Sequence, residues 1–193
     1  TTMTTRNRMT TIRPLAWMLS LGLGAVCCLA ADTIRFNSQP GGIMTIDGTS
    51  SLHDWTVTNR IIGGYVEMNA SAGADLTKIT AINAEVFVPV RSLKSYQVAM
   101  DNVMYDAMEA GKFPRITYKL LKLTPQSGGS ATNATYQAEG ELTIHGVTKP
   151  HTMPVTLQRV DEVRLKITGA TDLKMTDFGI KPPAPKLAMG LIK

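Results

Sequence analysis

Residues Tyr136–Leu157 read YQAEGELTIHGVTKPHTMPVTL, and this stretch decides the fold class. As far as Ile144, apolar or small residues occupy every second position and polar residues lie between them. This period is typical of a strand with one dry face and one wet face. His145-Gly146 interrupts it, and glycine can take the positive φ that a tight reversal needs. The alternation resumes at Met153, so the stretch predicts a long antiparallel hairpin, whose apolar face other strands must cover.

The rest of the chain repeats the two-residue period in short segments that turn residues separate. In Ile82–Val90 the alternation is complete, and the pair Gly63-Gly64 inside another segment predicts a sharp bend, as at a barrel corner. Ala70–Asp75 is small and polar, and we expect a turn there. Many short strands of this kind predict a mainly β sandwich or barrel. The other strand segments are Thr33–Asn37, Ile43–Ile46, His53–Asn59, Ile62–Met68, Ile116–Lys122 and Val163–Gly169.

One segment has helical spacing instead, and it predicts a helical insertion near residues 95–110. Its apolar residues fall at i, i+3, i+4, i+7 and i+8, and Gly111 and Pro114 follow as stop signals. Methionine suits a helix that only covers the sheet, which we favour for the stripe alone, and also a helix that contacts a variable apolar ligand. The stripe consists of Met100, Val103, Met104, Ala107 and Met108.

The first residues have the layout of a secretory signal peptide. Three arginines precede the apolar run Leu15–Leu29, and small residues follow it. The run is about fifteen residues long, which is short for a membrane span. We therefore expect a signal peptide over residues 1–31, cleavage near Ala30-Ala31, and a periplasmic or secreted domain over residues 32–193.

Removing this leader changes what the composition implies. The formal charge of +5 falls to +2 without the three leader arginines, and no basic stripe remains that would indicate nucleic-acid binding. Both cysteines, Cys27 and Cys28, lie in the leader, and the residues before them fit a lipid-attachment site poorly. The expected mature domain therefore has no disulfide and cannot be a thiol enzyme or a cysteine-zinc protein.

Seven motifs occur in an order that resembles the YceI family, in the branch with a Ser-Leu-His-Asp-Trp element. The resemblance runs from about Asp32 to the end, and it implies an exported, lipocalin-like antiparallel β-barrel of about eight strands. Members are described as binding long apolar molecules, such as isoprenoid lipids or quinones, inside the barrel. The motifs are Gly48–Trp55, Val88–Leu93, Met104–Met108, Gly111–Pro114, Ile116–Tyr118, Gly140–Pro150 and Met175–Ile180.

The chain departs from the family pattern at its end. Members usually continue past the Pro-rich stretch Pro182–Pro185 into a last strand, whereas this sequence stops at Lys193. We expect either a fragment or a barrel that lacks its closing strand, which would leave an open edge.

The resemblance and the apolar pattern together nominate a ligand-binding set. His53 is expected near the barrel mouth, in contact with a ligand head group, with Trp55 on the ligand tail. The alternative is a buried tryptophan with its N–H paired and a histidine that bonds a turn. The candidate lining residues are Leu52, Trp55, Val86, Val88, Met104, Met108, Phe113, Leu142, Ile144 and Phe178.

No catalytic or metal site is expected from the residues. The histidines of the mature domain, His53, His145 and His151, lack the i, i+4 spacing of a helical zinc site. His145 and His151 flank one turn, but carboxylates that would complete a metal site are not placed nearby. Ser50 and Ser51 lie near His53 without a nucleophile elbow. We therefore expect neither catalytic residues nor a cofactor, apart from a bound isoprenoid lipid or quinone.

These observations predict non-enzymatic binding, transport or sequestration of a long-chain apolar small molecule in the cell envelope. Transient contact with a membrane is compatible with this role, and the oligomeric state is left open. One alternative is an enzyme acting on a hydrophobic substrate, which needs a polar side chain with a shifted pKa inside the barrel. The other is a barrel filled to normal packing density that serves as a protein-interaction module.

Overall fold

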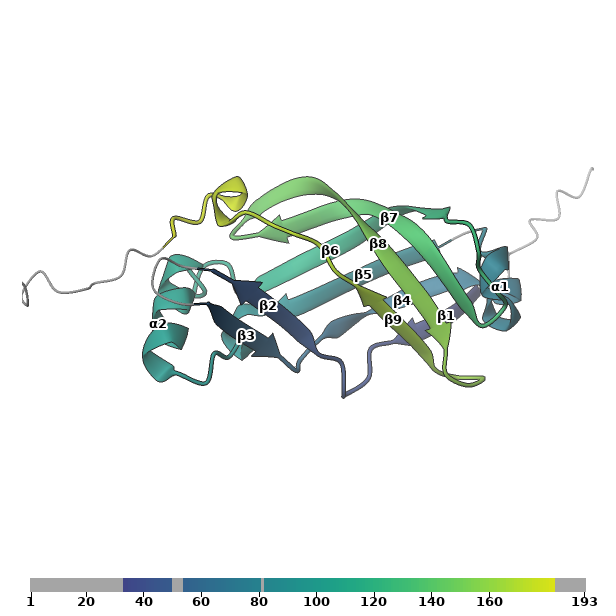
Figure 1. Cartoon of the computed structure of the whole chain (residues 1–193), viewed down its shortest axis with the longest axis horizontal. Helices are drawn as coiled ribbons and strands as arrows, with labels where there is room; N and C mark the ends of the chain where they lie inside the picture. Colours follow the sequence, from purple (N-terminus) through teal and green to yellow (C-terminus); the bar gives the residue numbers. More distant parts are fainter. Residues whose placement is uncertain (1–32, 50–53, 81, 183–193) are drawn as a thin grey trace, which may run out of the picture. The chain divides into compact units, whose positions relative to one another are not determined.

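The computed structural model describes residues 33–49, 54–80 and 82–182. Nine strands, all paired antiparallel, make up about half of these residues (Figure 1). Seven form one sheet in the order β1-β4-β5-β6-β7-β8-β9, and β2 pairs with β3. The predicted mainly β, antiparallel fold is confirmed. The strands are β1 (Thr33–Asn37), β2 (Met44–Gly48), β3 (Trp55–Asn59), β4 (Gly63–Asn69), β5 (Ile82–Pro89), β6 (Arg115–Pro125), β7 (Asn133–Ile144), β8 (Val147–Arg159) and β9 (Leu165–Gly169).

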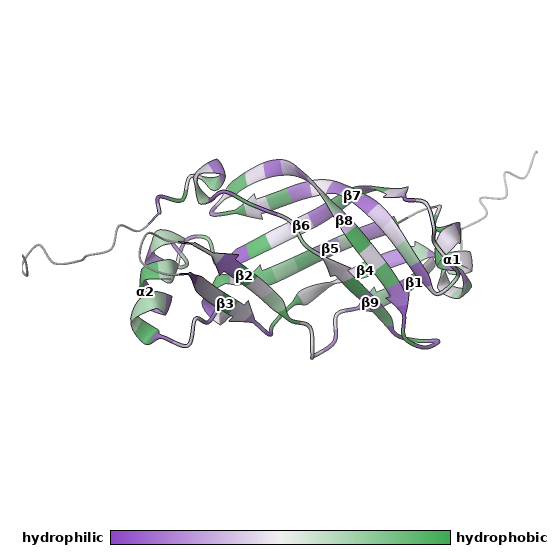
Figure 2. Cartoon of the chain, in the orientation of Figure 1, coloured by the Kyte–Doolittle hydropathy of each residue, from purple (hydrophilic) through white to green (hydrophobic). Residues whose placement is uncertain are grey.

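The hairpin that decided the fold class pairs along its whole length. Its ladder runs from Asn133 opposite Gln158 to Ile144 opposite Val147, and includes all twelve residues of β7. Hydrophobic and hydrophilic residues alternate along both strands (Figure 2). His145 and Gly146 form the turn with φ of 53° and 74°, and two positive φ angles match the right-handed twist of the flanking strands.

The first four strands form one long hairpin that bends in the middle. Thr33–Asn37 continues into β2, β3 continues into β4, and Ser38 N–H donates to the Gly64 carbonyl at 2.9 Å at the bend. Gly64 has φ of 136°, and a Cβ there would lie 2.1 Å from the Glu85 carbonyl oxygen. Only glycine fits such a position, and the bend predicted at Gly63-Gly64 is confirmed.

The inward-facing side chains form two apolar clusters at different ends of the concave face. The first cluster lies over β4 to β8 and two short helices, α1 (Ala70–Ala74) and the 3₁₀-helix η1 (Leu76–Lys78). Its buried members are Val66, Met68, Ala72, Leu76, Ala84, Leu120, Ala134, Tyr136, Ala138, Val155 and Leu157.

The second cluster joins β3 and the end of β7 to the helices η2 (Val90–Ser92), α2 (Val98–Ala107) and η3 (Met175–Phe178). Its buried members are Val57, Val90, Leu93, Tyr105, Met108, Ala110, Leu142, Ile144, Phe178 and Ile180.

The large sheet is curled. Ile34 and Phe36 on β1 and Leu165 on β9 all pack against the first cluster, although β1 and β9 are at opposite edges of the sheet. Figure 1 shows β8 and β9 crossing in front of β4 and β5. Within the described residues no ladder joins β9 to β1 or β2, so the sheet is a half-barrel. Two expectations lie outside the described residues. One is the absence of a closing strand, which concerns the chain beyond residue 182, and the other is the leader over residues 1–31.

One local expectation was wrong. Ala70–Asp75, predicted to be a turn, contains α1, and Ala72 is completely buried in the first cluster. The predicted helical insertion is α2, and Met100, Met104, Ala107 and Met108 of its stripe lie in or against the second cluster. Val103 departs from the prediction because it is 47% exposed, whereas Asp101 and Tyr105 are buried. No helix in the described part of the chain has both the length and the hydropathy needed to cross a membrane.

Candidate functional site

Between the two clusters lies a band of residues that we call the waist: Val86, Tyr118, Gly140 and His151, on β5 to β8. Val86 is paired with Tyr118, and Gly140 is paired with His151. A Cβ on Gly140 would lie 2.7 Å from both Cζ and Oη of Tyr118, so the tyrosine ring lies over this glycine. The waist is therefore the part of the concave face where one tyrosine occupies the space that another side chain would fill.

Tyr118 is the residue that connects the clusters, because it packs against both of them. Its hydroxyl is buried and has no hydrogen-bond partner among the described residues. Burial, followed by the charge of Glu139, raises the pKa of Tyr118 above its usual value. The side chain is therefore a neutral phenol, able to donate a hydrogen bond that nothing in this structure accepts.

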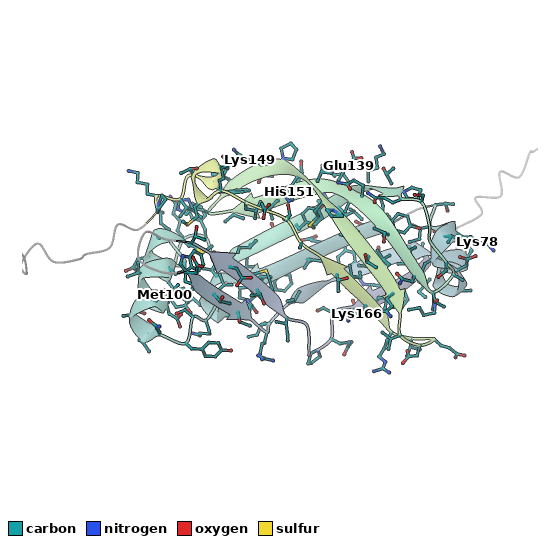
Figure 3. All side chains as sticks on the ribbon, in the orientation of Figure 1. Lys78, Met100, Glu139, Lys149, His151 and Lys166 are labelled. Carbon is teal, nitrogen blue, oxygen red and sulfur yellow. The ribbon has the colours of Figure 1, made fainter. Side chains whose placement is uncertain are left out.

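His151 supplies a second polar group at the waist, but it is already paired. Its Nε2 lies 3.1 Å from Oγ1 of Thr171. Lys149, two residues earlier on β8, lies with Nζ 5.9 Å from the ring centroid of Phe178 (Figure 3). The polar groups near the waist thus come from β6 and β8, and the tyrosine hydroxyl is the one that is buried without a hydrogen-bond partner in the described part of the chain.

The helical end of the domain carries a surface cavity of about 310 Å³ beside β3 and the start of α2. The loop Ser95–Gln97 borders this cavity, and Asp101 holds it in place. The N–H and the hydroxyl of Ser95 both donate to Oδ1 of Asp101 at 2.7 Å. Lys94 Nζ lies 3.7 Å from Oδ2 of Asp101. The cavity is lined by Asp54, Trp55, Thr56, Thr58, Ser95, Tyr96, Gln97 and Met100.

Burial alone would raise the pKa of Asp101, but the hydrogen bonds from Ser95 and the charge of Lys94 outweigh it and hold that pKa below its usual value. The ionised carboxylate therefore fixes the Ser95–Gln97 loop to α2. A second cavity, of about 210 Å³, lies at the other end, beside Gln126 and Tyr136. Ligand sites for small molecules usually measure about 300–1,000 Å³, so each cavity is small for a long lipid.

Most of the predicted lining residues gather at the second cluster. Val86 and Val88 lie on β5, where Val86 belongs to the waist and Val88 is buried. Phe113 lies at the hairpin turn, with its ring 4.9 Å from that of His145. Leu52 and His53 lie outside the described residues. The predicted lining residues that lie in or against the second cluster are Trp55, Met104, Met108, Leu142, Ile144 and Phe178.

The histidines that flank the hairpin turn have separate partners. His145 Nδ1 lies 3.2 Å from the Phe178 carbonyl oxygen, and its Nε2 lies 3.2 Å from Oε1 of Glu109. It connects the turn, the end of α2 and η3, whereas His151 contacts Thr171. Within residues 33–49, 54–80 and 82–182, no three or more histidine, cysteine or acidic side chains gather as a metal site would require.

Sequence reasoning did not single out Tyr118 or Asp101. A tyrosine on the apolar face of a strand reads as ordinary core. The available signal was Gly140, since a glycine on the apolar face of a neighbouring strand marks a close approach.

A family model described as the YceI-like domain matches residues 32–192. The chain belongs to the YceI-like family. It is 28% identical over 130 residues to a UPF0312 protein of Shewanella sp. (strain W3-18-1), which covers 63% of this chain and 64% of that protein. It is 27% identical over 148 residues to a UPF0312 protein of Pseudomonas putida, which covers 71% and 74%. This YceI-like chain therefore spans less than two thirds of the Shewanella relative.

Two solved structures resemble the YceI-like domain in fold. One is Burkholderia cenocepacia BcnA, with a TM-score of 0.60 and 17% identity over 73% of this chain and 82% of that one. The other is a polyisoprenoid-binding domain from Saccharophagus degradans, with a TM-score of 0.52 and 14% identity over 72% and 76%. At these identities the likeness concerns the fold alone. The fold is the lipocalin-like one that the sequence predicted, and in this chain it takes the form of a curled half-barrel.

Proposed function

We propose that this YceI-like domain binds a long apolar lipid of the isoprenoid or quinone type on its concave face, without catalysing a reaction. The observation that carries the proposal is the apolar concave face, which extends from the first cluster to the second. Side chains near its edges, such as Phe36, Met153 and Leu165, are only partly buried. The solved polyisoprenoid-binding domain of similar fold supports the same class of ligand.

The energetics of such binding need no special chemistry. Each buried CH₂ contributes about 0.8 kcal/mol. Twenty buried carbons therefore set an upper limit of roughly 16 kcal/mol, before the costs of association and of ordering the chain are subtracted. Apolar contact alone is then sufficient, and polar groups need only orient the head of the lipid.

Binding requires the domain to open, because its own side chains now occupy the concave face. Met104 and Met108 at one end and Met68 and Met153 at the other pack in or against the clusters. Unbranched methionine side chains change rotamer readily and can repack around a lipid tail. The edge strands β1 and β9 have no strand partner on their outer sides within the described residues, so they are the elements that would move.

Tyr118 is a polar side chain with a shifted pKa inside the sheet, which is what the enzyme alternative requires. Its shift is upward, so the phenol stays protonated at neutral pH and can donate a hydrogen bond but cannot act as a general base.

We place the domain in the cell envelope, as a carrier or store, on the basis of the leader pattern in residues 1–31. Expression in a Gram-negative host followed by intact-mass measurement of the periplasmic fraction tests this. Cleavage near Ala30-Ala31 is expected, and uncleaved protein found only in the cytoplasm would contradict it.

A protein-interaction module is the second candidate, favoured by the two clusters of side chains that already fill the concave face. Native mass spectrometry and solvent extraction of protein purified from the envelope decide between the two functions. Lipid binding predicts a co-purified isoprenoid, or uptake of added ubiquinone or polyprenol at a ratio of one per chain. Folded protein that carries no lipid and takes up neither ligand would favour the interaction module.

A further inference from the structure

The hydroxyl of Tyr118 is the feature of the concave face that packing does not explain. It is buried between two apolar clusters without a hydrogen-bond partner. A buried donor left unpaired costs about 1–3 kcal/mol, and phenylalanine would fill the same space without that cost. The other tyrosine of the concave face, Tyr136, donates its hydroxyl to the Leu76 carbonyl. The contrast shows that this sheet can satisfy an inward-facing tyrosine.

We propose that Tyr118 donates a hydrogen bond to an oxygen atom on the head of the bound lipid. The inference rests on the proposed function and adds a ligand class to it: isoprenoids that carry a neutral oxygen acceptor, such as a quinone carbonyl. The head lies at the waist, and the tail extends over a cluster. Gly140 makes room for the tyrosine at the waist, because a Cβ there would lie 2.7 Å from the Tyr118 hydroxyl oxygen.

The chemistry of the waist selects a neutral head over an anionic one. The Tyr118 hydroxyl is buried between two apolar clusters. A phosphate at that hydroxyl would bury a charge there, which costs far more than burying a neutral oxygen atom. A neutral oxygen acceptor avoids this cost and still accepts the hydrogen bond.

Binding of three ligands to the full chain tests the inference: a short-tailed ubiquinone, squalene as a headless isoprenoid, and a polyprenyl phosphate. The wild-type chain and Tyr118→Phe are compared by equilibrium binding. One lost hydrogen bond corresponds to about a fivefold to tenfold loss of affinity. We expect that loss for ubiquinone and an unchanged affinity for squalene. The carbonyl stretch of ubiquinone should move to lower frequency in the wild-type complex and not in the variant.

Tyr136→Phe is the matched control, because it removes an inward-facing hydroxyl from the same sheet but leaves the waist intact. It should keep the wild-type preference for ubiquinone over squalene. Equal affinity of Tyr118→Phe and wild type for ubiquinone, or an equal loss for squalene, would overturn the inference while the proposed function stands. Tightest binding of polyprenyl phosphate, lost in Tyr118→Phe, would overturn the choice of a neutral head. A wild-type chain that binds none of the three ligands would overturn both proposals.

Discussion

At the scale of single residues, two tyrosines on one concave face differ in what their hydroxyls do. The hydroxyl of Tyr136 donates to the Leu76 carbonyl and ties β7 to η1, whereas the hydroxyl of Tyr118 has no partner in the described structure. A satisfied buried hydrogen bond stabilises the folded state, and an unsatisfied donor destabilises it. The same residue type therefore contributes to stability with opposite sign at the two positions.

Replacing each tyrosine by phenylalanine measures this difference. We expect Tyr136→Phe to lower the free energy of unfolding by about 1–2 kcal/mol, since it leaves the Leu76 carbonyl without its donor. Tyr118→Phe should leave the free energy unchanged or raise it, because it removes only an unpaired group. Urea denaturation of the lipid-free protein provides the comparison. A loss at Tyr118 equal to the loss at Tyr136 would mean that the hydroxyl of Tyr118 has a partner in solution.

Asp101 gives a prediction that depends on pH. Its folded pKa is held below the usual value, so its ionised form stabilises the fold above the unfolded pKa of about 3.9. That stability is lost as pH falls through the folded pKa. We expect Asp101→Asn to cost about 1–2 kcal/mol at pH 7 and progressively less below about pH 4. Asp106→Asn, on the exposed side of α2, is the control and should cost little at any pH. A cost for Asp101→Asn that stays constant with pH would contradict the ionic role.

At the scale of elements, the sequence predicted what local periodicity determines and missed what tertiary contact determines. The β7–β8 hairpin and β5 followed from alternation, and the bend at Gly64 followed from the glycine pair. The burial of Tyr105 on α2 did not, because its hydroxyl donates hydrogen bonds to the backbone of η2 and Leu93. The unpaired state of Tyr118 is likewise a property of three strands together, so no single-strand pattern could reveal it.

The bend between β3 and β4 can be tested at one position. Gly64→Ala would force a side chain into a backbone conformation that only glycine adopts readily, and would place its Cβ 2.1 Å from the Glu85 carbonyl oxygen. We expect a loss of at least about 2 kcal/mol in the free energy of unfolding. Gly111→Ala is the control, because nothing lies within 4 Å of the added Cβ and φ is not positive. Thermal melts of the two variants should therefore separate clearly, and equal melting temperatures would show that the bend is not required.

At the scale of the whole described domain, the two clusters share β7 and Tyr118. One end of β7 contributes Ala134 and Tyr136 to the first cluster, and the other end contributes Leu142 and Ile144 to the second. Loss of either cluster removes support from a strand that both use. The half-barrel should consequently unfold as one cooperative unit, even though its core is divided.

A substitution in one cluster, observed from the other, tests this cooperativity. Trp55 packs against the second cluster, and Trp17→Phe leaves it as the single tryptophan of the chain. In that background we expect Leu76→Ala, which opens a cavity in the first cluster, to lower the free energy of unfolding by about 2–5 kcal/mol. The urea midpoints from Trp55 fluorescence and from far-ultraviolet circular dichroism should fall together. If the fluorescence midpoint stays in place while the dichroism midpoint falls, the clusters unfold separately, and opening one end to admit a lipid would leave the other undisturbed.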